Sequence, residues 1–63
     1  MLEEALLRDQ VQALLAKEKQ AEEAYGDLIA KVDDATLKDQ LEQLRRDKQR
    51  HIRLAERLLE ILE

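Results

Sequence analysis

The stretch "KVDDATLKD", residues 31–39, is the one place where the regular apolar pattern of this 63-residue chain is interrupted. Asp33 and Asp34 are of a residue type that caps the start of a helix, and Asp39 is placed to support the first turn of a following helix through the helix dipole. We therefore predict one helix over about 2–32, a tight turn at about 33–35, and a second helix over about 36–62.

The composition agrees with two long helices. The chain contains no proline, and Gly26 is its single glycine, so no strong helix breaker lies inside either segment. Apolar residues make up 44% and charged residues 41% of the sequence, with Tyr25 as the one aromatic residue. Chains below roughly 70–80 residues seldom build a sufficient core alone, and no cysteine is present to form a disulfide. We therefore expect an all-α fold that is completed by association with another chain.

Each predicted helix carries a largely apolar stripe at alternating spacings of four and three residues, which is typical of helices packed at a shallow angle. In the first helix the stripe comprises Leu7, Val11, Leu14, Glu18, Ala21, Tyr25, Leu28 and Val32. In the second helix it comprises Leu37, Leu41, Leu44, Lys48, His51, Ala55, Leu58 and Leu62.

A short turn makes the two helices antiparallel neighbours, so positions whose numbers sum to about 69 face each other. Glu18, Lys48 and His51, the polar members of the two stripes, then lie at the same height near the middle of the hairpin. Tyr25 is expected as a core aromatic residue whose hydroxyl group reaches this polar layer or the bundle surface. The spacing thus predicts a polar core of Glu18, Tyr25, Lys48 and His51.

Apolar residues flanking the stripes leave more surface than two helices can cover. The simplest solution is an antiparallel two-helix hairpin that dimerises into a four-helix bundle, because closed two-fold dimers are the commonest oligomers. We expect a homodimer or a higher homo-oligomer. The flanking residues are Leu6, Leu15, Ile29, Ile52, Leu54, Leu59 and Ile61.

Two segments resemble the ferritin-like and rubrerythrin-like superfamily. In "AKEKQAEEAYGDLIAKV", residues 16–32, Glu18 precedes Tyr25 by seven residues, as in the first metal-ligand helix of that family. In "LRRDKQRHIRLAERLL", residues 44–59, His51 matches the histidine of the Glu-x-x-His motif, and Lys48 stands where the family has glutamate. The resemblance implies half of a four-helix bundle, with a carboxylate-bridged di-iron centre shared between two hairpins.

Lys48 counts against di-iron and oxygen chemistry, because a dimer would bring two ammonium groups and only half of the family's carboxylates to the site. In the favoured interpretation the Lys48 ammonium replaces the metal and pairs with Glu18, within one chain or across the dimer. Alternatively, Lys48 extends past the bundle edge to solvent. His51 is interpreted as a core histidine that is hydrogen-bonded to Glu18. The alternative is a metal site for iron or zinc with Glu18 and His51 of both copies as ligands and Asp47 at its edge.

Several functional classes fit the sequence poorly. The net charge is −4, and the arginines of the second helix alternate with acidic residues, which favours ion pairs over nucleic-acid binding. No segment approaches the ~20 apolar residues of a membrane span, and without a signal-peptide pattern we expect a cytoplasmic protein. Serine, cysteine and glycine-rich phosphate loops are absent. We expect a cofactor-free structural or interaction protein rather than an enzyme, with another protein as an alternative partner.

Overall fold

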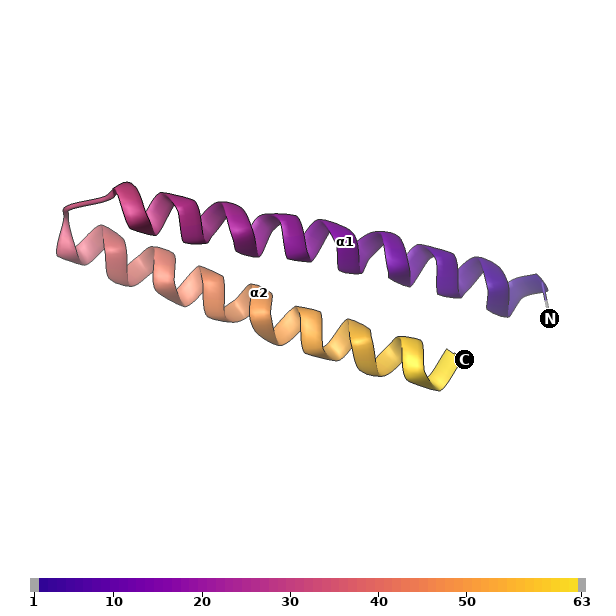
Figure 1. The fold of residues 1–63 in the computed structure, drawn as a ribbon. Coiled ribbons are helices and arrows are strands. Elements are labelled where there is room, and N and C mark those ends of the chain that lie inside the picture. Colours follow the sequence, from indigo (N-terminus) through magenta and orange to yellow (C-terminus); the bar gives the residue numbers. More distant parts are fainter. Residues whose placement is uncertain (1, 63) are drawn as a thin grey trace.

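A computed structural model describes residues 2–62 and consists of two antiparallel helices, α1 (Leu2–Lys31) and α2 (Ala35–Leu62), which lie side by side along most of their length (Figure 1). The all-α hairpin predicted from the sequence is confirmed, and the described residues 2–62 contain no strand. The molecule is a rod of 50 × 14 × 11 Å. α1 spans 30 residues and α2 spans 28 residues, so each helix runs along nearly the whole rod.

The turn between the helices is set by Asp34. Its side-chain Oδ1 accepts a hydrogen bond of 2.9 Å from the backbone N–H of Leu37, which is the geometry of a helix N-cap. Its backbone carbonyl accepts a further hydrogen bond of 2.9 Å from the N–H of Lys38. α2 therefore begins at Ala35 and α1 ends at Lys31, each one residue earlier than the sequence-based boundary.

α1 continues without interruption through Gly26. A Cβ atom at this position would lie 3.3 Å from the guanidinium carbon of Arg45, which is closer than ordinary van der Waals contact. The glycine therefore lets the long Arg45 side chain of α2 lie directly across the backbone of α1. This contact offsets part of the cost of about 1 kcal/mol that glycine carries in a helix interior relative to alanine.

The two helices enclose very little apolar core. Val11 and Ile29, at 7% and 8% exposure, are the buried hydrophobic residues of the described chain. Leu15 of α1 and Ile52 and Leu59 of α2, predicted to flank the stripes, are partly covered by the contact between the helices.

The prediction that the whole stripe of each helix packs inside the hairpin is therefore wrong. Six of its leucines remain between 43% and 57% exposed, because contact with one neighbouring helix covers only a narrow strip of a helix, and the predicted stripe is wider than that strip. These leucines are Leu7, Leu14, Leu28, Leu37, Leu44 and Leu58.

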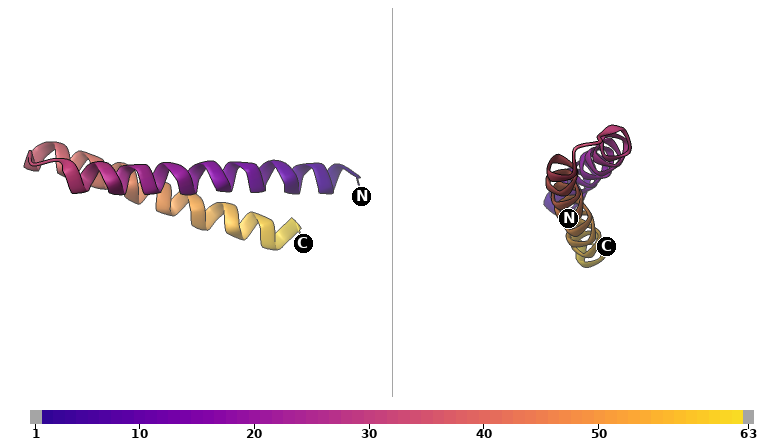
Figure 2. Two further views of the ribbon diagram at one scale, coloured as in Figure 1. Left: turned by 45° about the horizontal axis from the view of Figure 1, so that its top comes forward. Right: turned by 90° about the vertical axis from the view of Figure 1, so that its left-hand side faces the viewer.

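The hairpin is tighter at the turn than at its other end. Figures 1 and 2 show the helices diverging toward the end where the two termini lie, with α1 extending beyond α2. We call this the open end. Neither described helix has a stretch apolar and long enough to cross a membrane.

Candidate functional site

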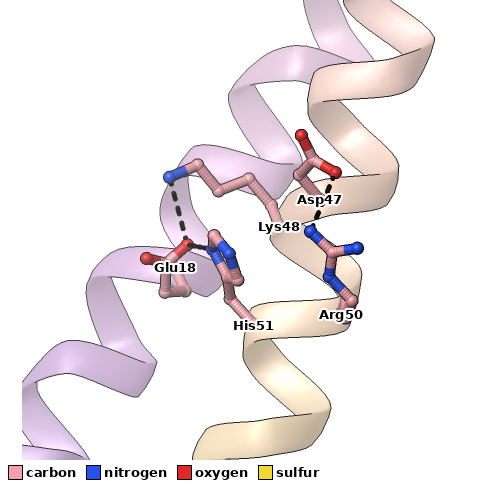
Figure 3. Close-up of polar contacts among 5 residues, drawn as sticks. All are labelled: Glu18, Asp47, Lys48, Arg50 and His51. Carbon is pink, nitrogen blue, oxygen red and sulfur yellow. Dashed lines mark hydrogen bonds and ion pairs between the residues drawn. The ribbon is translucent and has the colours of Figure 1, made fainter.

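Glu18 of α1 contacts both Lys48 and His51 of α2 at mid-hairpin (Figure 3). The Lys48 Nζ lies 3.2 Å from Glu18 Oε2, and the His51 Nδ1 lies 3.6 Å from the same oxygen. The Glu18 and Lys48 side chains are 22% and 28% exposed, whereas the His51 side chain is 45% exposed. Lys48 therefore reaches inward along the interface, and His51 sits at the edge of the hairpin rather than in a closed core.

The interaction at Glu18 is an ion pair rather than a well-aligned hydrogen bond. Glu18 Oε2 is buried, and within residues 2–62 it has no hydrogen-bond donor in suitable geometry. The contact with His51 exceeds normal hydrogen-bond length and is ionic only when the imidazole is protonated. Lys48 is therefore the main compensation for the half-buried charge of Glu18, and removal of its ammonium group would leave that charge unpaired.

A second polar cluster lies one helical turn closer to the hairpin turn. Arg45 Nε donates a hydrogen bond of 2.8 Å to Glu22 Oε1, and Gln49 Nε2 donates one of 3.1 Å to the same oxygen. The hydrogen bond from Arg45 lowers the pKa of the Glu22 carboxyl group below its ordinary value of 4.5, and the Gln49 amide acts in the same direction. The same contact raises the pKa of the Arg45 guanidinium group.

This second cluster was not among the predicted site residues. The sequence predicts ion pairs for the arginines of α2 and leaves Glu22 as a solvated residue that can join the polar network, without matching Glu22 to Arg45. The available signal was the position of Glu22, one turn after Glu18 and opposite Arg45 in the predicted register. Together the clusters form one polar layer, which we define as Glu18, Glu22, Arg45, Lys48, Gln49 and His51. Its two carboxylates are balanced by one guanidinium and one ammonium group.

The polar contacts follow the predicted alignment of the two helices. The pairs Glu18–Lys48, Glu22–Arg45, Glu18–His51 and Glu22–Gln49 have residue numbers that sum to 66, 67, 69 and 71. These values agree with the alignment predicted from the turn and the two stripes.

Tyr25 and Asp47 lie apart from these contacts. Tyr25 is partly buried, and its hydroxyl group makes no hydrogen bond to another part of the described chain. Asp47, the expected edge ligand of a metal site, pairs instead with the exposed Arg50 on its own helix, at 3.3 Å (Figure 3). The structure thus brings three of the four predicted core residues together and leaves Tyr25 without a polar role in the hairpin.

A single hairpin does not fit the di-iron centre of the ferritin-like family. Residues 2–62 hold no cluster of three or more histidine, cysteine or carboxylate side chains arranged to bind a metal. Glu18 and His51 supply two donor groups, and the Lys48 ammonium group, 3.2 Å from Glu18 Oε2, would repel a metal cation bound to that oxygen. A metal site of the predicted kind would need the ligands of a second copy.

Comparisons with known proteins identify no relative: no family model matches the chain, and neither curated proteins nor solved structures give a significant match. The resemblance to the ferritin-like superfamily therefore rests on the residues of this chain alone and stays a prediction.

Proposed function

We propose that this chain is a small structural or interaction protein that acts as a metal-free homodimer, with two hairpins forming a ferritin-like four-helix bundle. The observation that carries this proposal is an unpaired apolar surface, which we call the leucine face. It consists of six exposed leucines, interrupted at mid-height by the partly covered Ala21 and the polar His51: Leu7, Leu14 and Leu28 of α1 and Leu37, Leu44 and Leu58 of α2.

The two halves of the leucine face lie on the same side of the hairpin. In α1 each member stands one position before a residue that is buried or partly covered by α2, as Leu14 stands before Leu15. In α2 the same holds for Leu44, His51 and Leu58, while Leu37 continues the seven-residue spacing near the turn. Because the helices are antiparallel and both right-handed, an equal rotation from the contact line points to the same side of the pair. The leucine face is therefore one continuous surface with a seven-residue repeat along each helix.

The exposed area of the chain matches the needs of a dimer. The hairpin exposes 5093 Å², whereas a compact folded monomer of 7.4 kDa exposes about 4200 Å². The excess of about 900 Å² is close to the ~800 Å² per partner that a standard protein–protein interface buries. The radius of gyration of 14.8 Å also exceeds the ~11 Å of a compact domain of this length. A second hairpin laid on the leucine face would remove the excess of exposed area and would give the 50 Å rod a thicker, more compact cross-section.

The polar layer would then determine how the two hairpins align. It lies at mid-height, so a two-fold axis through that level brings both copies of Glu18, Lys48 and His51 to the bundle centre. A slipped alignment would place the ammonium group of Lys48 against leucines, where an unpaired charge is costly. Polar residues in otherwise apolar helix interfaces are known to select one register and one oligomeric state. In this proposal Lys48 takes the place of the ions.

The test is the concentration dependence of thermal unfolding. A homodimer unfolds at a temperature that rises with protein concentration, because dilution favours the dissociated chains. Leu44→Glu places a carboxylate on the leucine face and should abolish this dependence. Gln43→Glu is the matched control, since it adds the same charge at the adjacent exposed position. An unfolding temperature of the native chain that is independent of concentration would contradict the proposal.

A metal-binding homodimer is the second candidate, favoured by one observation. Glu18 Oε2 is buried without an aligned donor and lies beside His51 Nδ1, so two metal-type ligands converge if Lys48 moves aside. The test is elemental analysis after exposure to iron and zinc salts and desalting. About half an equivalent of metal per chain, lost in His51→Ala, would establish a site shared by two subunits. Absence of retained metal from both proteins would exclude it.

A further inference from the structure

A second exposed surface of the hairpin lies outside the leucine face. Four large apolar residues do not belong to that face, and all four lie near the open end of the hairpin. Leu2 and Leu6 of α1 are 77% and 56% exposed, and Leu54 and Ile61 of α2 are 50% and 78% exposed. Dimerisation through the leucine face would therefore leave a further apolar surface near the termini.

On α2 this surface is strongly basic. Arg46, Arg50, Arg53 and Arg57 follow one another at spacings of four, three and four residues, so they form one stripe along the helix, and all are exposed. The last three line a hollow of about 190 Å³ together with Leu54. Among the described residues, Arg50 pairs with Asp47, and the structure gives the other three arginines no ion pair. We call this stripe, with Leu54 and Ile61, the arginine face.

On α1 the corresponding outer stripe has the opposite charge. It runs at the same four–three spacing along the side of α1 that points away from α2, and all of its members are exposed. It carries three carboxylates, no basic residue, and small or apolar residues between them. We call it the acidic face: Leu2, Leu6, Asp9, Ala13, Ala16, Gln20, Glu23 and Asp27.

We propose that the arginine face of one copy docks against the acidic face of another copy, so that hairpins associate side by side beyond the dimer. Arginine guanidinium groups form two-pronged hydrogen bonds with carboxylates, and the apolar members of both faces give the contact surface to bury. The alanines of the acidic face allow the long arginine side chains to approach closely. The contact does not use the leucine face and so does not depend on it.

The geometry makes this contact a repeating one. The two faces belong to different helices and point in opposite directions, away from the space between α1 and α2. A contact between unlike surfaces on opposite sides of one molecule does not close on itself unless its rotation forms a ring. Each added copy therefore presents a new free face, and association continues with concentration.

A carboxylate-bearing helix fits the arginine face better than a nucleic acid does. Asp47, Glu56 and Glu60 lie along the borders of the stripe and would repel the closely spaced charges of a phosphate backbone more than the three separated carboxylates of the acidic face. The face also contains no aromatic side chain on which a base could stack. Its exposed leucine and isoleucine suit apolar side chains of a protein partner.

The experiment is sedimentation velocity of the full chain at low and high salt, with paired charge reversals. The native protein should form species larger than the dimer at about 50 mM salt and lose them at about 0.5 M, because exposed ion pairs are screened. Arg53→Glu with Arg57→Glu, and separately Glu23→Lys with Asp27→Lys, should each weaken this association at least about tenfold. An equimolar mixture of the two double variants should restore it, since each supplies the face that the other needs.

A control variant of equal net charge distinguishes the loss of a specific contact from general repulsion between highly charged chains. The arginine reversal changes the net charge from −4 to −8, whereas the acidic reversal changes it from −4 to 0. Lys19→Glu with Lys38→Glu also gives −8 at two exposed positions outside both faces and should leave association unchanged. Circular dichroism checks that every variant keeps its helices.

The proposal is overturned if the native chain forms nothing larger than a dimer at low salt, if either reversal leaves association intact, or if the mixture fails to restore it. Failure of the dimer itself would appear differently, as monomers at high salt in every variant.

Discussion

The space between α1 and α2 and the leucine face contrast in what they contain. Between the helices, two apolar residues are buried to less than 10% exposure and the middle is filled by charged and amide groups. The leucine face carries six leucines that are about half exposed, and covering each would contribute about 1 kcal/mol. We therefore propose that the contact within the hairpin sets the alignment of the helices, and that most of the stabilising burial would come from contact between hairpins in the proposed dimer.

The largest expected effect compares two adjacent leucines. Leu14 lies on the leucine face and is 57% exposed in the hairpin, whereas Leu15 lies between the helices. In a dimer both are covered, so Leu14→Ala should lower the free energy of unfolding by about 2 kcal/mol per copy, as much as Leu15→Ala does. Chemical denaturation of the two variants measures the difference. If Leu14→Ala costs less than about 0.5 kcal/mol while Leu15→Ala costs far more, the leucine face is not an interface.

The next largest loss of stability is expected from substitutions in the polar layer. Lys48→Met removes the ammonium group but keeps most of the side-chain volume, and it leaves the Glu18 charge without its ion-pair partner. We expect a loss of about 1 kcal/mol, which is modest because the pair is partly exposed to solvent.

The double variant Glu18→Leu with Lys48→Met tests whether the pair determines the register. It should recover or exceed native stability, because both half-buried charges are gone. Its NMR spectrum should show more than one alignment of the helices, whereas the native chain shows one. Native-like uniqueness in the double variant, or a Lys48→Met variant that is more stable and equally ordered, would refute the role of the layer in fixing the register.

A substitution in the turn serves as a control, because it should lower the free energy of unfolding by a similar amount without changing the polar layer or the leucine face. Asp34→Ala removes the side-chain acceptor of the Leu37 N–H at the start of α2 and should cost about 1 kcal/mol in thermal or chemical unfolding. Asp33→Ala, one position earlier in the same turn, should lower the free energy of unfolding by only a few tenths of the loss caused by Asp34→Ala. Asp33 is exposed and makes no such contact in the described chain. Equal effects of the two substitutions would show that the cap is misassigned.

The smallest effect is a dependence on acid pH. The pKa of Glu22 is lowered in the folded chain, so its contribution to stability is fully present above 4.5 and is lost as the pH falls through the lowered pKa. The difference in unfolding temperature between the native chain and Glu22→Gln should therefore narrow as the pH falls below 4.5. A constant difference across that range would mean that Glu22 is not held ionised by Arg45.

The hairpin and its alignment could be predicted from the sequence because both depend on local signals. The aspartates at the turn and the four–three stripes need no knowledge of the rest of the fold to be read. The choice between Asp33 and Asp34 as the cap depends on the exact end of α1, which packing decides.

The sequence does not show which leucines lie between the two helices and which lie on the leucine face. Leu14 and Leu15 are chemically identical neighbours, and the crossing of the two helices determines which one is covered. The Glu22–Arg45 contact was missed for a related reason, since it depends on Gly26 leaving room for the guanidinium group. A contact between long, flexible side chains depends on how closely the two helix backbones approach each other. That distance is set only when the two helices pack together.

Sedimentation equilibrium of the native chain at micromolar concentration and moderate salt tests the central claim most directly. We expect a mass of twice 7.4 kDa, that is 14.8 kDa, for the smallest stable folded species. A folded, fully helical monomer of 7.4 kDa under these conditions would contradict it, because the leucine face would then be exposed without a partner.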